Sequence, residues 1–178
     1  MILALTILSL GCILAYTLAV CLKFKGIPNS ISASFYSLEH KYWFRFTMWV
    51  APILLLPAIL EVSKPNTEFL AFLAIVGMII VGCFPDYAND KFSKRGHESG
   101  AIMTMVFSQI WVGFNKPILL SLWALYLLYT ATSMFIAYKK MNTLEFKVDF
   151  RYLYINTNPL FWIEIFAITS TFMSLFFI

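Results

Sequence analysis

Two ionisable side chains stand where one apolar segment ends and the next begins, and a third stands inside an apolar segment. Asp86 follows Pro85 at the end of one segment, and His97 precedes the following one. If the two segments form a hairpin, a carboxylate and an imidazole meet at its base, an arrangement used in general-base catalysis, metal ligation and proton relay. The same pair also serves as a polar contact that closes a loop, so both interpretations stay open.

Glu164 is the third group, in the apolar run NPLFWIEIFAITS, roughly 8 Å from the start of that helix. A carboxyl group at that depth in a membrane is costly, usually faces other helices, and marks a functional site by default. The alternative is a side chain that reaches back to the interface or pairs with Lys147 or Arg151. With Asp86 and His97, Glu164 is therefore a candidate catalytic residue.

The serine-rich stretch NSISASFYSLEHKYWFR follows the helix breaker GIP. Serine is a common helix N-cap, which predicts a short interfacial helix leading into the next apolar segment. Its Ser32, Ser34 and His40 are candidates for binding a ligand.

A divalent metal is the possible cofactor, with His97, Asp86 and Asp90 as the ligand set. Catalytic zinc usually takes three protein ligands and a water molecule. The chain has only two histidines, and its three cysteines lack CxxC spacing. Carboxylates must therefore complete any such site.

The composition defines the elements that must hold these groups. The chain is 61% hydrophobic and 12% charged, with a mean hydropathy of +0.80. A soluble domain of this length cannot cover its surface with so few charges. Long unbroken apolar runs predict helices rather than transmembrane β-strands. The expected fold is an all-α polytopic membrane protein, one domain over residues 1–178.

Six apolar segments are long enough to cross roughly 30 Å of hydrocarbon. Within them, Gly77 and Gly82 favour close approach of helices, and Gln109 is suited to a hydrogen bond between helices. The expected spans are residues 2–22, 43–62, 68–86, 99–115, 117–138 and 159–178.

Lys and Arg residues set the expected orientation. Eleven of the thirteen lie in or beside the first, third and fifth loops, and only Lys64 and Lys116 lie on the other side. The three basic loops are then cytoplasmic, both termini face outward, and the cytoplasmic (inner) membrane is the expected location. The net charge of +4 follows from this bias, so no nucleic-acid partner is required. The topology brings the serine-rich stretch and the three ionisable candidates to one face.

The fifth loop contains an unusual stretch, Leu144–Tyr154, in which apolar and polar residues alternate as LEFKVDFRYLY. Period two gives an extended segment one apolar face and one charged face. Two interpretations stay open: a strip lying on the lipid headgroups, or pairing with another loop, a partner or a second copy of the chain.

Three short motifs carry a resemblance to known proteins: SISASFY, VGCFPD, and His97 with GAIM. On these motifs the first 115 residues resemble six-helix membrane proteins of unknown function from gut Bacteroidetes and their phages, distantly similar to the Dram/Sfk-like membrane family. The resemblance implies six helices and no established activity. A more distant likeness is to the CREST-type membrane hydrolases, which place Ser, Asp and several His around zinc at one membrane face.

Three functions are compatible with these observations. The first is a non-enzymatic bundle that binds a lipid or small ligand, or a membrane subunit of an assembly, and the lack of a complete catalytic motif favours it. The second is an intramembrane metal-dependent hydrolase using Asp86 and His97. The third is a proton- or ion-coupled transporter or channel using Glu164, against which the scarcity of charge inside the spans argues.

Overall fold

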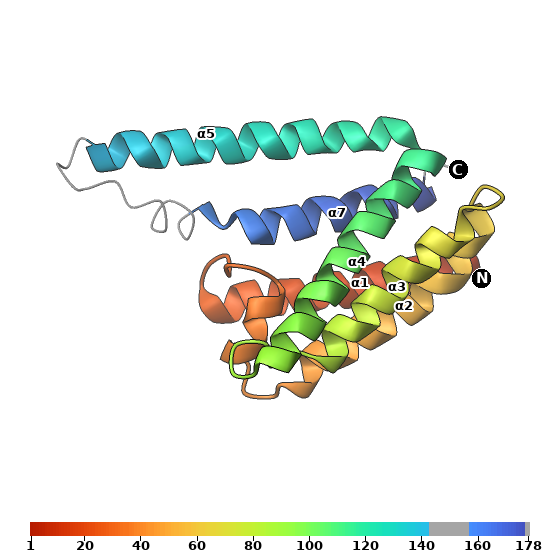
Figure 1. The fold of residues 1–178 in the computed structure, drawn as a ribbon, viewed down its shortest axis with the longest axis horizontal. Helices are drawn as coiled ribbons and strands as arrows, with labels where there is room; N and C mark the ends of the chain where they lie inside the picture. Colours follow the sequence, from red (N-terminus) through yellow and green to blue (C-terminus); the bar gives the residue numbers. More distant parts are fainter. Residues whose placement is uncertain (143–156, 177–178) are drawn as a thin grey trace.

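The computed structural model describes residues 1–142 and 157–176, and in that part of the chain every regular element is a helix (Figure 1). The expected all-α class is therefore confirmed. The predicted extended strip Leu144–Tyr154 lies outside the described residues. The long helices are α1 (Ile2–Phe24), α2 (Tyr42–Val62), α3 (Glu68–Cys83), α4 (Lys91–Asn115), α5 (Leu122–Asn142) and α7 (Pro159–Phe176), and the short 3-10 helices are η1 (Ser32–Ser37) and η2 (Pro117–Ser121).

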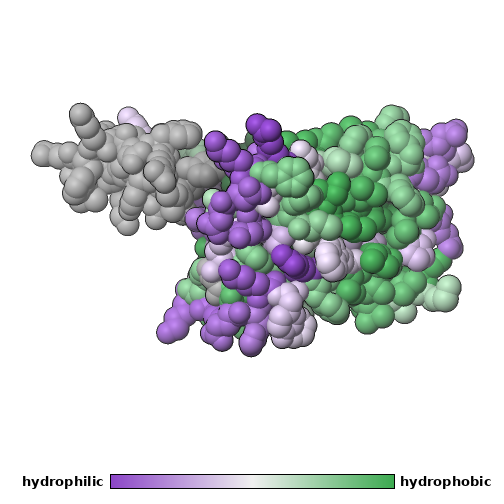
Figure 2. Space-filling view, turned by 60° about the horizontal axis from the view of Figure 1, so that its bottom comes forward, coloured by the Kyte–Doolittle hydropathy of each residue, from purple (hydrophilic) through white to green (hydrophobic). Residues whose placement is uncertain are grey.

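Within residues 1–142 and 157–176, four helical segments are long and apolar enough to cross a membrane. They are α1, α2, α7 and the segment Pro117–Lys139, which joins η2 to most of α5. Figure 2 shows a belt of apolar surface between hydrophilic ends, as expected for a chain embedded in a bilayer. These features indicate a membrane-embedded protein.

The charged stretch before the fourth predicted span is helical, which differs from the expected boundary. α4 begins at Lys91 rather than at residue 99, and α3 ends at Cys83 rather than at residue 86. The reason is local: the Asp90 carboxylate accepts a hydrogen bond from the Ser93 N–H at 2.7 Å and caps the helix. His97 consequently lies on a helix, about one turn before the apolar run of α4 that starts at Ala101.

α3 and α4 form a tight hairpin because two glycines face each other where the helices cross. A Cβ added to Gly77 would meet the Gly100 carbonyl oxygen at 2.7 Å, and one added to Gly100 would meet the Gly77 oxygen at 2.8 Å. Gly82 likewise makes room for the Trp49 indole. The predicted close approach at Gly77 and Gly82 is confirmed, and Gly100 is the partner that the sequence did not reveal.

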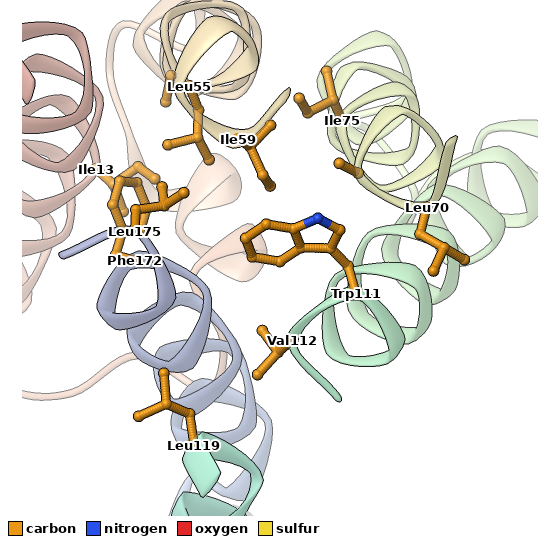
Figure 3. Close-up of a cluster of buried hydrophobic side chains, with 12 residues drawn as sticks. Ile13, Leu55, Ile59, Leu70, Ile75, Trp111, Val112, Leu119, Phe172 and Leu175 are labelled. Atoms are coloured by element: carbon orange, nitrogen blue, oxygen red, sulfur yellow. The ribbon is translucent and has the colours of Figure 1, made fainter. Parts of the chain in front are cut away.

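The largest side chain of the apolar core is Trp111, which is fully buried between α2, α3, α4 and α7 (Figure 3). Its Nε1–H donates to the Ser63 hydroxyl at 2.7 Å, so the polar atom of the indole is satisfied. Ile59, Ile75 and Val112 pack around the ring. This cluster closes the bundle at the end that carries the α2–α3 turn.

α5 packs beside α7 at the edge of the bundle (Figure 1). Only 6% of the residues in its membrane-crossing segment are buried, against 44% in α2. One contact to the bundle is polar: the Gln109 amide oxygen of α4 accepts from Trp123 of α5 at 2.9 Å and from Ser170 of α7 at 2.8 Å. The predicted interhelical role of Gln109 is thus confirmed.

Candidate functional site

The bundle contains a cavity of about 170 Å³ enclosed by α1, α2, α3, α4, α7 and the segment around η1. Most of its walls are apolar, with Met48, Met78 and Met105 among them. Its inner end is formed by side chains that also belong to the core cluster of Figure 3, namely Ile13, Leu55, Ile59, Ile75 and Phe172.

Most hydroxyl groups that line the cavity are already bonded to backbone carbonyls. Ser9 donates to the Ala51 oxygen at 2.7 Å, Thr104 to the Gly100 oxygen at 2.9 Å, and Thr171 to the Ala167 oxygen at 2.8 Å. These hydroxyls therefore have little capacity left for a ligand. The polar groups that remain are Ser32 and two ionisable side chains, His97 and Glu164.

The segment after α1 brings Ser32 to the cavity because it folds back against the bundle instead of lying on the surface. Lys25 ends α1 in the left-handed conformation, with φ of 52°. Beyond it, the Asn29 carbonyl accepts from the Phe161 N–H at 3.1 Å, and the buried side chains of Ile31 and Phe35 join the core. This segment closes the cavity at one end.

Glu164 fastens this segment to α7. Its Oε2 accepts the Ile31 N–H at 2.5 Å, and the Ser32 side chain approaches the same carboxyl group. Glu164 therefore faces the bundle interior, as its depth predicts. The described residues form two ion pairs, Lys23–Glu39 and Lys94–Glu98, so no described basic side chain pairs with Glu164.

His97, on α4, is 5% exposed and also lines the cavity. Its Nδ1 lies 3.0 Å from the Phe84 carbonyl oxygen. A carbonyl only accepts, so Nδ1 carries the hydrogen, and Nε2 of the neutral ring is an acceptor. The Tyr87 ring packs on the imidazole with centroids 4.3 Å apart.

Tyr87, in the turn between α3 and α4, contacts both His97 and the serine-rich segment beside the cavity. Its phenol interacts with the side chains of Ser32 and Ser30. Burial raises the pKa of the Tyr87 phenol, so the group stays protonated at neutral pH and can donate. Tyr36 packs edge-on against the Tyr87 ring at 5.2 Å and accepts the Ala88 N–H, which holds the turn against η1.

The other predicted site residues lie elsewhere. Asp86 accepts from the Asn89 amide at 2.7 Å within the turn, so the Nδ1 of His97 is bound by a backbone carbonyl and not by this carboxylate. Ser34 is fully buried, and its hydroxyl is shared between Tyr16 and the Ile31 carbonyl. His40 is exposed beside Tyr42, outside the cavity.

The proposed metal ligands are not brought together. Asp90 is occupied as the cap of α4, where the Ser93 N–H lowers the pKa of its carboxyl group. Over residues 1–142 and 157–176, no group of three or more His, Cys, Asp or Glu side chains is placed to hold a metal ion. His97, Asp86 and Asp90 therefore do not form such a group.

Two parts of the site were missed by sequence reasoning. Tyr87 stands next to Asp86 in the sequence, and an aromatic residue in a polar turn is the only signal that points to it. The Ile31 N–H, which binds Glu164, is a backbone group and leaves no mark on the sequence.

Comparison of the chain with protein-family models, curated proteins and solved structures finds no match. The resemblance to six-helix bacterial membrane proteins therefore stays a prediction.

Proposed function

We propose that the chain crosses the membrane six times, with both termini on the non-cytoplasmic side. The two termini lie at the same end of the ribbon in Figure 1, as an even number of crossings requires. The two basic residues of the predicted outer loops, Lys64 and Lys116, lie at that end, in the α2–α3 and α4–α5 turns. The uneven distribution of the remaining basic residues supports a cytoplasmic location for the opposite end.

Within this topology, the function we propose is the binding of a small, mainly apolar ligand between the helices. The observation that carries the proposal is the cavity of about 170 Å³, whose walls are mostly apolar and include the polar side chains of Ser32, His97 and Glu164. Ligand pockets in proteins typically combine apolar walls with a few placed polar groups. An apolar cavity of about 150 Å³ can hold a benzene molecule, so this one has room for a group of that size.

A metal-dependent hydrolase is less well supported. It needs a ligand set that includes Asp86 and His97, and these residues make their hydrogen bonds to Asn89 and Phe84 instead. An ion-coupled transporter rests on Glu164 as a single acidic group. The cavity supports ligand binding without further assumptions.

The test is equilibrium binding of toluene to the protein in phosphatidylcholine nanodiscs, followed as a thermal stabilisation that rises with ligand concentration. Ala74 lines the cavity, so Ala74→Leu places three extra carbon atoms there. The proposal predicts stabilisation of the wild type and its loss in Ala74→Leu.

The matched control is Leu127→Phe, because Leu127 is exposed on the outer face of α5 and should leave toluene binding unchanged. Equal stabilisation of all three proteins would show that toluene acts through the bilayer, and would overturn the proposal.

A further inference from the structure

The two ionisable groups at the cavity are both hydrogen-bond acceptors. The Phe84 carbonyl fixes the hydrogen of His97 on Nδ1, which leaves Nε2 as an acceptor. Glu164 uses Oε2 to accept the Ile31 N–H, and its remaining lone pairs can only accept while the group is ionised. A ligand head group that satisfies both must therefore donate hydrogen bonds.

The charge of Glu164 also favours a ligand head group that donates hydrogen bonds. A carboxylate away from water is costly unless it is paired with a cation. Two basic side chains of the described residues form ion pairs with other carboxylates: Lys23 pairs with Glu39 at 2.9 Å and Lys94 with Glu98 at 3.8 Å, both on the surface. Among the described residues, Glu164 has no cationic partner, while it lines the cavity.

Aromatic rings complete the environment. Tyr16 and Phe44 line the cavity, and their rings meet edge to face with centroids 6.1 Å apart. The faces of such rings attract a desolvated cation. Together with the two acceptors, they favour a positively charged head group over a neutral one.

We propose that the ligand is a small amine, whose ammonium group binds Glu164 and His97 and whose apolar tail fills the cavity towards Ile59 and Phe172. This rests on the proposed function. The volume of about 170 Å³ accommodates a tail about the size of one benzene ring, which excludes a lipid with two acyl chains. The Ser32 hydroxyl, beside the same carboxyl group, accepts a further N–H of the ammonium group.

The test compares three ligands that share one tail, namely benzylammonium, benzyl alcohol and toluene, in phosphatidylcholine nanodiscs. The readout is the dissociation constant from thermal stabilisation at neutral pH. The proposal predicts that the wild type binds benzylammonium at least about tenfold more tightly than benzyl alcohol, since a hydrogen bond to a charged group is the stronger one. This comparison needs no variant and does not depend on how a mutant folds.

Glu164→Gln keeps an acceptor for the Ile31 N–H and removes the charge, so it should abolish the preference for benzylammonium over benzyl alcohol. Glu61→Gln is the matched control, because Glu61 is exposed at the end of α2 and outside the cavity; it should keep the preference. Equal binding of benzylammonium and benzyl alcohol overturns the amine proposal, and so does a preference for benzylammonium that survives Glu164→Gln. In either case, binding of toluene would still support the proposed binding of an apolar ligand in the cavity. If none of the three ligands binds, the proposed function fails and the amine proposal fails with it.

Discussion

Glu164 joins two segments that are far apart in the chain, because its Oε2 accepts a hydrogen bond from the Ile31 N–H. The Ile31 N–H that it binds belongs to the segment that closes the cavity. A buried N–H without an acceptor costs about 1–3 kcal/mol. The carboxylate therefore has a structural role as well as the binding role proposed for it.

Replacing Glu164 by Leu should destabilise the protein by about 1–3 kcal/mol, because Leu offers no acceptor to the Ile31 N–H. Glu164→Gln should retain most of the stability, since its amide oxygen still accepts. Thermal unfolding in detergent, with proteolysis of the segment around residues 25–41 as a local probe, measures both effects. Equal stability of the Leu and Gln variants would show that this hydrogen bond does not hold the segment.

His97 should be found as the tautomer with hydrogen on Nδ1. The Phe84 carbonyl requires that tautomer, and burial prevents water from competing for it. Nitrogen NMR of histidine-labelled protein distinguishes a protonated from an unprotonated ring nitrogen. The exposed His40 provides the reference signal in the same spectrum. A His97 signal with hydrogen on Nε2 would contradict the assignment of that nitrogen as an acceptor for the ligand.

The crossing of α3 and α4 holds two walls of the cavity together. At Gly77 and Gly100, each backbone fills the space in which the other residue would carry a side chain. Small residues at such a crossing allow the close packing that drives association of membrane helices. The position of His97, one turn before Gly100, depends on this contact.

Gly100→Ala should lower the unfolding temperature, because its methyl group would lie 2.8 Å from the Gly77 carbonyl oxygen and force the helices apart. Gly11→Ala is the matched control in α1, where an added Cβ meets nothing within 4 Å and improved helix propensity contributes up to about 1 kcal/mol. Thermal unfolding of both variants in one detergent gives the comparison. A Gly100→Ala protein as stable as Gly11→Ala would mean that the helices can separate without cost.

The sequence predicted the positions of the helices better than the contacts between them. Apolar runs predict where helices lie because hydropathy is a local property. The expected start of α4 at residue 99 was wrong, because the first turns of the helix are charged and are capped by Asp90. The pairing of Gly77 with Gly100 is not readable in the same way, since it depends on how two helices cross. The cavity depends on packing among five helices and has no local signature at all.

At the scale of the whole molecule, an apolar belt lies between two hydrophilic ends (Figure 2). The sequence predicted that the serine-rich stretch, Asp86, His97 and Glu164 share one face. The structure brings Ser32, His97 and Glu164 to the cavity and leaves Asp86 in the adjoining turn. The difference arises because the backbone carbonyl of Phe84 takes the hydrogen bond expected for the carboxylate.

The six-span topology predicts opposite labelling of two positions with a membrane-impermeant maleimide. In a chain whose natural cysteines are replaced by alanine, Lys64→Cys should react in intact cells and Lys91→Cys only after the cells are opened. Both side chains are exposed, so access depends on the side of the membrane. Labelling of both residues from outside would rule out this topology.

The central claim is that a small apolar ligand enters the bundle, and photolabelling with a benzene-sized apolar diazirine tests it most directly. Met78 and Met105 line the cavity from α3 and α4, whereas Leu127 and Phe135 face outward from α5 and report labelling from the bilayer. Peptide mass spectrometry should find label on both sets in the wild type, and Ala74→Leu should lose it from the methionines only. Label confined to α5 in both proteins would contradict the account, because the cavity would then not be open to a ligand.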